Sequence, residues 1–181
     1  WHKKTAEEVL QEEEFNKIGC GSVGRNYSVQ WRDFNGKTDQ IQELVDEMKA
    51  DIMSSRLKVS AWNATEKNMT ALPACHDGFQ VVGIPMENEE FGFELHFNMR
   101  SVDVFLGFPF NIASYGLLAK IIEQITGFKA LGIEGTLKCV HFYDNQYEAV
   151  NKLLQRNPDT HPNCEVELKP TDVILSETQS V

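Results

Sequence analysis

The sequence predicts an α+β fold in which a mixed sheet is backed by helices, and three stretches carry this prediction. Residues 91–99 (FGFELHFNM) alternate between apolar and polar side chains, as expected for a strand with one buried face. Apolar residues recur at helical spacing after Thr38, and residues 112–127 are apolar around most of a helical circumference. Strands clustered with long helices favour a layered α+β domain.

The first residues are predicted to lie outside the main domain. Residues 5–15 place a narrow apolar stripe among many glutamates, which is typical of a surface helix. Residues 19–24 (GCGSVG) look like a phosphate-binding glycine loop but lack its lysine, so we interpret them as a flexible connector. We therefore expect an acidic helix and connector over residues 1–23 and a single domain over residues 24–181.

The first half of the domain should contain one helix and two strands. The helix follows Thr38 and runs for about three turns, because its apolar residues lie at i, i+3, i+4 and i+7. They are Ile41, Leu44, Val45 and Met48. Residues 56–62 and 79–84 are predicted strands, and the consecutive apolar residues of the second suggest that it is covered on both faces.

The second half begins with the alternating strand and continues with a long apolar helix. We expect the helix over residues 112–127 to be central and buried and to end at Gly127, since glycine tolerates a left-handed helix cap. A strand over residues 135–143, a helix over 147–156 and a short strand over 165–170 complete the prediction.

Composition excludes several classes of partner. A formal net charge of −10 argues against binding a nucleic-acid duplex, because affinity for phosphate backbones comes from clustered lysine and arginine. No stretch approaches the roughly 18 to 20 apolar residues of a membrane helix, and the charged N-terminus carries no signal-peptide core. No membrane association and a cytoplasmic location are therefore expected. Four widely spread cysteines form neither a disulfide framework nor a zinc pattern, so reduced thiols and no metal are expected.

Cys75 stands beside His76 in the proline-marked stretch LPACH, between two predicted strands. A catalytic cysteine needs nearby positive charge and access to substrate, and a loop supplies access. The alternative is an inert buried cysteine, because a free thiol packs like a small hydrophobe. The dipeptide alone does not decide between the two interpretations.

A second group of polar residues surrounds the end of the alternating strand. Arg100 closes this strand with Ser101 beside it, and this pair suits a phosphate monoester through charge-assisted hydrogen bonds. Asp103 follows, and a Gly-Phe-Pro-Phe turn then brings Asn111 to the start of the long helix. The alternatives are an ion pair between Arg100 and Asp103 and a helix cap by Asn111.

His141 and Tyr143 are two residues apart on a predicted strand, so their side chains should project to the same face. Two polar rings in this arrangement could hold a sugar hydroxyl. They could equally be partly exposed residues at the margin of a sheet.

Taken together, these segments resemble the thymidylate synthase family from about Gly24 to Pro170. The similar segments occur in the same order as in the family: QWRDF, DQIQELV, SSRLKVSAWN, LPACH, RSVDVFLGFPFNIASYGLL and VHFY. LPACH and FPFNIASY are long enough to be specific. The resemblance implies a thymidylate synthase-like mixed sheet backed by helices.

The resemblance also implies an activity: a cysteine thiolate adds to C6 of deoxyuridylate (dUMP), and C5 then accepts a one-carbon unit from 5,10-methylenetetrahydrofolate to give dTMP. By motif, Cys75 would be the nucleophile, Arg100 would bind the phosphate and favour the thiolate, and Asn111 would pair with the uracil edge. Arg56, Ser101, Asp103, His141 and Tyr143 would also bind dUMP, and Trp31, Asp103, Leu106, Gly107 and Phe110 would line the folate site.

The family is dimeric, and the resemblance therefore implies a homodimer. Arg56 matches an arginine that reaches across the interface to the partner's phosphate. The family normally has two adjacent arginines at this point, whereas this chain has Ser55 before Arg56. One phosphate ligand is therefore expected to be lost.

Several departures from the family pattern leave alternatives open. Nothing resembles the family's N-terminal third, and the chain stops short of the segment that closes over folate. It is therefore expected to be a fragment, a subunit completed by a separate chain, or a degenerate copy. Lys138 and Cys139 replace a Gly-Asp pair, and NMRS is similar to the phage hydroxymethylase branch. The alternatives are a dUMP hydroxymethylase giving 5-hydroxymethyl-dUMP and a non-catalytic structural or assembly subunit that keeps the fold.

Overall fold

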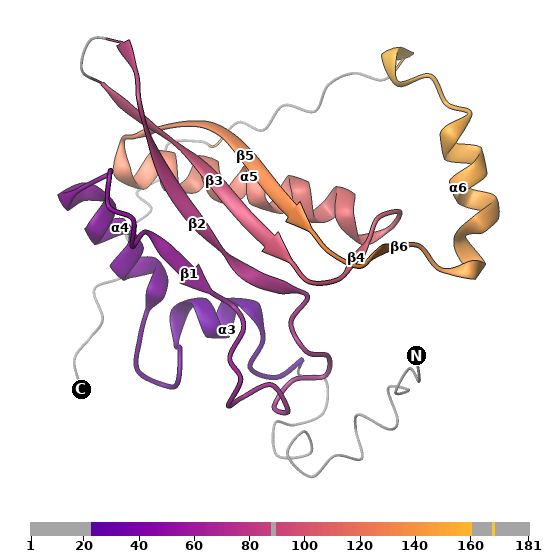
Figure 1. Ribbon diagram of the computed structural model, residues 1–181, viewed down its shortest axis with the longest axis horizontal. Helices are drawn as coiled ribbons and strands as arrows, with labels where there is room; N and C mark the ends of the chain where they lie inside the picture. Colours follow the sequence, from indigo (N-terminus) through magenta and orange to yellow (C-terminus); the bar gives the residue numbers. More distant parts are fainter. Residues whose placement is uncertain (1–22, 88–89, 161–167, 169–181) are drawn as a thin grey trace.

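The computed structural model describes residues 23–87, 90–160 and 168. The predicted helix over residues 5–15 and all but Leu168 of the predicted strand over residues 165–170 lie outside these ranges. Figure 1 shows a twisted sheet with the long helix α5 lying across one of its faces. None of the described helices is long and apolar enough to cross a bilayer.

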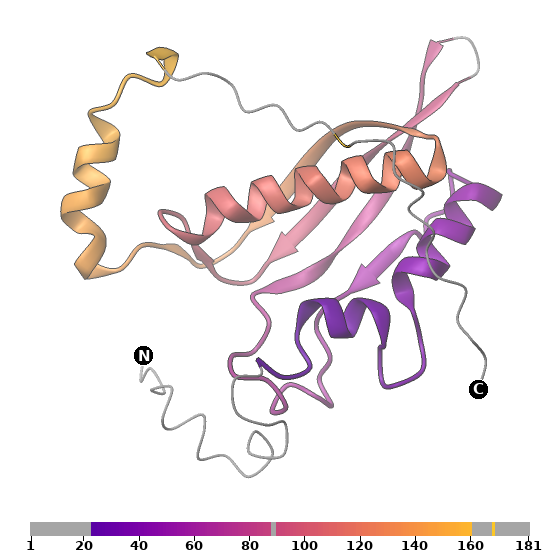
Figure 2. The same cartoon turned by 180° about the vertical axis from the view of Figure 1, so that it is seen from behind.

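The main sheet is mixed, as predicted. Its strands are β1 (Lys58–Ser60), β2 (His76–Pro85), β3 (Phe91–Met99) and β5 (Lys129–Leu137), in the spatial order β1-β2-β3-β5. The first three are antiparallel, whereas β5 runs parallel to β3. A parallel pair needs a crossover connection, and α5 (Gly107–Thr126) supplies it by packing back on the sheet (Figure 2).

The core lies between the sheet and its helices. Phe79 of β2 pairs with Phe97 of β3, and both stay within 3% exposure under Tyr115 of α5. The strand β3 has the same bounds as the alternating stretch of the sequence, with Phe93, Leu95, Phe97 and Met99 buried. The prediction that β2 is covered on both faces was wrong, because Phe79 and Val81 are buried while Val82 is only half-buried.

Helix α4 (Gln40–Ala50) confirms the helical spacing after Thr38. Its buried residues are Leu44, Val45 and Met48, and Asp39 caps its first turn by accepting a hydrogen bond from the amide of Gln42. A shorter helix, α3 (Tyr27–Arg32), has six residues and begins after a cap by Asn26. It was not predicted, since six residues are too few to display a helical period.

Helix α5 differs from its prediction in two ways. It begins at Gly107, so the expected Gly-Phe-Pro-Phe turn is its first turn; Pro109 fits there because first-turn amides lack partners within the helix. Asn111 is therefore inside the helix and does not cap it. The helix is also buried on one face only, at Tyr115, Ala119 and Ile122, while Phe110 is 69% exposed. Its end at Gly127, with φ of 81°, is as predicted.

The strand expected over residues 135–143 is divided. β5 ends at Leu137, and a short strand β6 (Val140–His141) follows after Cys139, whose φ of 43° lies in the left-handed region. β6 pairs in parallel with β4 (Val102–Asp103), which places Asp103 opposite His141. This small two-stranded sheet is therefore built from the two segments that follow β3 and β5.

Helix α6 (Tyr147–Leu154) lies where a helix was predicted and ends two residues earlier. It is preceded by the 3₁₀ turn η2 (Asp144–Gln146), and a second 3₁₀ turn, η3 (Pro158–Thr160), follows it. None of its residues is buried, and Figure 1 shows it standing away from the sheet.

Candidate active site

Buried polar contacts hold the loop that leads to Cys75. Glu66 in this loop accepts hydrogen bonds from Arg25 at 2.8 Å and from Gln30 at 2.7 Å. Asn63, which is 8% exposed, donates to the side chain of Gln30. Burial by itself would raise the pKa of Glu66, but the two hydrogen bonds and the Arg25 charge hold this pKa below its usual range. These hydrogen bonds join the middle of the loop to Gln30 of α3.

Arg100 holds the same loop at its end. The backbone amide of Arg100 donates to the carbonyl of Cys75 at 2.8 Å. The guanidinium donates to the carbonyls of Ala74, through Nε at 2.8 Å, and of Pro73, through Nη2 at 3.0 Å. The structure therefore places Arg100 against the two residues that precede the half-buried Cys75. The alternative of an ion pair with Asp103 is wrong, because the Asp103 carboxylate binds the start of α5 and Gln146 instead.

Tyr27 is a member of this group that the sequence did not reveal. Its hydroxyl oxygen accepts a hydrogen bond from the amide of Cys75 at 2.9 Å. Burial raises the pKa of Tyr27, and the nearby Cys75 and Arg100 side chains also act on its hydroxyl. One sequence signal could have pointed to it, namely its position just before the QWRDF segment.

His76 opens β2 and connects it to α5. The strand pairing shifts register between His76 and Gly78, and a side chain at Gly78, with φ of 150°, would collide with the backbone of Val59. The imidazole Nδ1 lies 2.9 Å from the hydroxyl of Tyr115, and Nε2 lies 3.3 Å from Nδ2 of Asn111. Burial lowers the pKa of His76, which keeps the ring neutral at neutral pH.

Asp103 organises the start of α5. Its carboxylate accepts hydrogen bonds from the amides of Phe105 and Leu106 and from the side chain of Gln146. Burial opposes ionisation, but these hydrogen bonds outweigh it and hold the pKa of Asp103 below its usual range. Gly107 leaves room nearby, since an added methyl group would lie 3.6 Å from Asp103 Cβ and 3.7 Å from Asn111 Oδ1.

His141 and Tyr143 lie side by side, as expected from their spacing. Their ring centroids are 5.3 Å apart, with the planes at 82°. Nδ1 of His141 donates to the carbonyl of Cys139 at 2.7 Å, so Nε2 is the nitrogen left for other partners. Because Asp103 pairs with His141 in the small sheet, these rings belong to the same region as Asp103.

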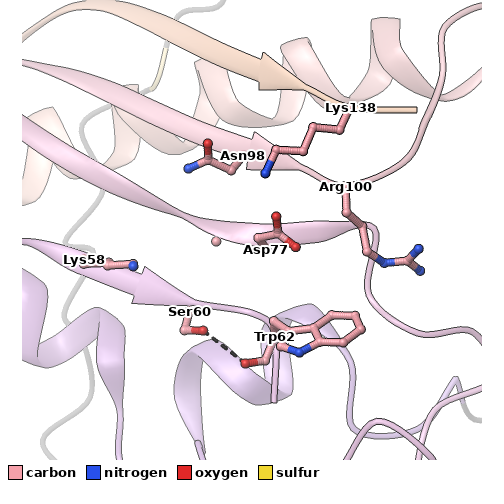
Figure 3. Close-up of a pocket in the computed structure, with 8 residues that line it drawn as sticks. Lys58, Ser60, Trp62, Asp77, Asn98, Arg100 and Lys138 are labelled. Atoms are coloured by element: carbon pink, nitrogen blue, oxygen red, sulfur yellow. Dashed lines mark hydrogen bonds between the residues drawn. The ribbon is translucent and has the colours of Figure 1, made fainter. Parts of the chain in front are cut away.

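Arg100 also lines a pocket of about 490 Å³ on the sheet face turned away from α5. Its lining residues are Lys58, Ser60, Trp62, Asp77, Gly78, Asn98, Arg100 and Lys138. Figure 3 shows Asp77 on β2 and Lys138 directly after the end of β5, on either side of Asn98 of β3, around this space. The Arg100 guanidinium lies 5.6 Å from the centre of the Trp62 ring. Three cationic side chains against one carboxylate suit an anion, although the chain as a whole is acidic.

The comparison with known proteins decides the family. The family described as thymidylate synthase matches residues 1–180 of the chain. The chain belongs to the thymidylate synthase family. It is 41% identical over 142 residues to a probable thymidylate synthase of Escherichia phage T5, covering 78% of this chain and 49% of that relative. It is 36% identical over 160 residues to the thymidylate synthase of Mycoplasma pneumoniae, covering 88% of this chain and 53% of that relative.

A solved structure supports the same assignment. The crystal structure of thymidylate synthase from T4 phage superposes with a TM-score of 0.69 at 36% identity, covering 87% of this chain and 54% of that one. The chain spans about half the length of the curated thymidylate synthases that it matches. The family match begins at residue 1, whereas the resemblance recognised in the sequence begins at Gly24.

Three further residues were assigned to binding from the thymidylate synthase pattern alone. The Arg56 side chain is 84% exposed and pairs with Glu47 of α4. Trp31 packs edge-on against Phe79 in the core, and its buried indole nitrogen has no hydrogen-bond partner among the described residues. Ser101 is half-buried directly after Arg100. Their roles in binding stay predictions.

One group of side chains among the described residues carries nitrogen and oxygen atoms that could bind a metal ion. Glu94, His96 and Glu134 place one donor atom each within 4.8 Å of one another. All three lie on the solvent-facing side of β3 and β5, where His96 pairs with Glu134. None of the three residues makes one of the His76 contacts or lines the Arg100 pocket, so the group is separate from the candidate site.

Proposed function

We propose that this chain carries the thymidylate synthase reaction, one-carbon transfer from 5,10-methylenetetrahydrofolate to C5 of dUMP giving dTMP. The observation that carries the proposal is the attachment of the Arg100 guanidinium to the carbonyls of Pro73 and Ala74, directly before Cys75. These hydrogen bonds fix a cationic side chain on the two residues that precede the half-buried Cys75, and this supports the proposal because a nucleophilic cysteine needs positive charge nearby.

In the proposed reaction the Cys75 thiolate would form a bond to C6 of the pyrimidine, and the electron pair of the C5–C6 double bond would move toward O4. C5 would then form a bond to the methylene carbon of the folate co-substrate as the bond from this carbon to a folate nitrogen breaks. Loss of the C5 proton and breaking of the Cys75–C6 bond would release the thiolate, and hydride from the folate would reduce the methylene to the methyl group of dTMP, leaving dihydrofolate. Arg100 and Ser101 would bind the phosphate, and Asn111 would offer the base one donor and one acceptor. The Asn111 amide lies close enough to His76 for a hydrogen bond, which supports a fixed orientation.

The sugar and the folate would bind near Asp103 and the start of α5. His141 and Tyr143 would hold the deoxyribose hydroxyl, because their side chains lie side by side and each carries a hydrogen-bonding group. Leu106 and Phe110 are 58% and 69% exposed at the start of α5, so they offer an apolar surface to which the folate ring system could bind. Gly107 has no side chain to cover this surface. Trp31 of α3 would also line the folate site.

We also propose the partners that the family implies. Arg56 is exposed enough to reach a second copy of the chain, which supports a homodimer in which it binds the partner's phosphate.

Incubation with dUMP and 5,10-methylenetetrahydrofolate tests the reaction directly. We expect dTMP together with dihydrofolate, because the methylene unit is reduced by hydride from the folate. Mass spectrometry of the nucleotide and absorbance of dihydrofolate measure the two products. A nucleotide heavier by a hydroxymethyl group, with no dihydrofolate, would instead assign the chain to dUMP hydroxymethylases.

Replacement of Asn111 tests recognition of the base. Asn111→Asp should weaken dUMP binding and strengthen dCMP binding, because a carboxyl group no longer presents the amide donor that O4 requires. The ratio of the two dissociation constants should change by roughly tenfold or more, the usual effect of an unpaired polar group in a site. Calorimetry with each nucleotide measures the ratio, and an unchanged ratio would remove Asn111 from the base site.

A further inference from the structure

Three polar side chains form a hydrogen-bonded series that runs from the core to the proposed base ligand. Its inner member is Tyr115 of α5, which is 3% exposed. The Tyr115 ring stacks on Phe97 with centroids 4.2 Å apart and planes at 12°, so the hydroxyl has a fixed position. His76 follows, with Nδ1 at 2.9 Å from this hydroxyl, and Asn111 ends the series.

With the Asn111 amide in the orientation that the structure shows, its donor assigns the position of the His76 proton. Nδ2 of Asn111 is a donor, so Nε2 of His76, 3.3 Å away, must accept from it. A neutral imidazole carries one proton, which therefore belongs to Nδ1 and is donated to the hydroxyl oxygen of Tyr115. Burial lowers the pKa of His76, with Asp77 acting in the opposite direction, and this keeps the ring in the neutral form.

The two assignments depend on each other, because an unprotonated Nε2 favours the amide orientation in which Nδ2 faces His76. Nδ2 faces His76, and the amide keeps Oδ1 and its second N–H for a ligand, in a fixed order. Uracil offers an N3–H donor beside an O4 acceptor, whereas cytosine offers an N3 acceptor beside an amino donor. Cytosine therefore requires the amide to turn over, which would bring Oδ1 against the lone pair of Nε2. Two acceptors in contact repel each other unless the imidazole proton moves to Nε2.

We propose that Tyr115 is a positioning residue that holds His76 in the Nδ1–H tautomer, orients the Asn111 amide and thereby selects uracil over cytosine nucleotides. The inference rests on the proposed function, because it uses the placement of the pyrimidine edge on Asn111. It adds a residue that lies behind the base ligand and does not touch the substrate.

Tyr115→Phe is the informative variant, because it keeps the ring that stacks on Phe97 and removes only the acceptor for Nδ1–H. Long-range ¹H–¹⁵N NMR should find the His76 proton on Nδ1 in the free wild-type protein and on Nε2 in the variant. The preference for dUMP over dCMP, taken as the ratio of dissociation constants, should fall roughly tenfold. Tyr147→Phe is the matched control, since Tyr147 is 60% exposed on α6, and it should change neither quantity.

The two parts of the experiment separate the possible failures. A wild-type His76 proton on Nε2 would overturn the inference, and this measurement requires no variant to fold. Wild-type protein that binds dUMP, with an unchanged preference in Tyr115→Phe, would also overturn the inference and leave the proposed function in place. Failure of the wild type to bind either nucleotide would overturn the proposed function and, with it, the role of Tyr115.

Discussion

Replacement of Cys75 by serine is expected to abolish turnover and to spare nucleotide binding. A serine hydroxyl in this position is a far weaker nucleophile than a thiolate, so the initial rate of dihydrofolate formation should fall on the order of 10³-fold or more. The phosphate and base ligands proposed here, Arg100 and Asn111, are separate side chains, so the dissociation constant for dUMP should change little. Initial rates and calorimetric titration with dUMP measure the two effects.

Cys139→Ser is the matched control, because Cys139 is a second free thiol among the described residues and is exposed. We expect near wild-type rates from this variant. Trapping with 5-fluorodeoxyuridylate and folate adds a structural measurement, since a stable covalent complex should form in the wild type and fail to form in Cys75→Ser. Near wild-type turnover in Cys75→Ser would show that the nucleophile is another residue.

Arg100→Ala should have the second largest effect, on both binding and stability. The variant loses the hydrogen bonds of the guanidinium to the carbonyls of Pro73 and Ala74. Because hydrogen bonds of charged groups are each worth roughly 1.5 to 3 kcal/mol and two are lost, the free energy of unfolding should fall by about 3 kcal/mol. The affinity for dUMP should fall roughly a hundredfold, since a charge-assisted phosphate contact is lost as well.

Two further variants distinguish the effect of Arg100 on stability from its effect on dUMP affinity. Arg100→Lys should keep part of the phosphate affinity through its charge, yet it should lose loop stability, because an ammonium cannot reproduce the planar fork of a guanidinium. Arg156→Ala, at an exposed position after α6, should alter neither quantity. Thermal unfolding and calorimetry measure both. An Arg100→Ala protein with wild-type affinity for dUMP would exclude a phosphate role for Arg100.

Most of the elements could be predicted where a single periodic pattern covers a whole element. β3 has the bounds of the alternating stretch, and α4 follows the helical spacing that begins at Ile41. The errors occurred at boundaries that neighbouring elements decide. The turn residues before Asn111 became the first turn of α5, and the pairing of β5 with β3 began the strand at Lys129, where no alternation marks it.

The candidate site divides in the same way. Five residues could be proposed from the sequence because each belongs to a short segment that resembles the family pattern, namely Cys75, Arg100, Asn111, His141 and Tyr143. Tyr27 was not proposed, since its partner Cys75 is 48 residues away along the chain and only its position before the QWRDF segment pointed to it. The role of His76 was also missed, because its neighbour Cys75 suggested a local partnership whereas its hydrogen bonds go to Tyr115 and Asn111 on α5.

The amino-acid sequence by itself determined the chemical groups of this protein, the periodic elements that carry them and the family to which they belong. The tertiary structure decided which of these groups meet. The physical reason is that the hydrogen bonds joining Tyr27 to Cys75 and Tyr115 to His76 form between distant segments. They exist only after α3 and α5 have packed on the sheet, and no local pattern records that packing.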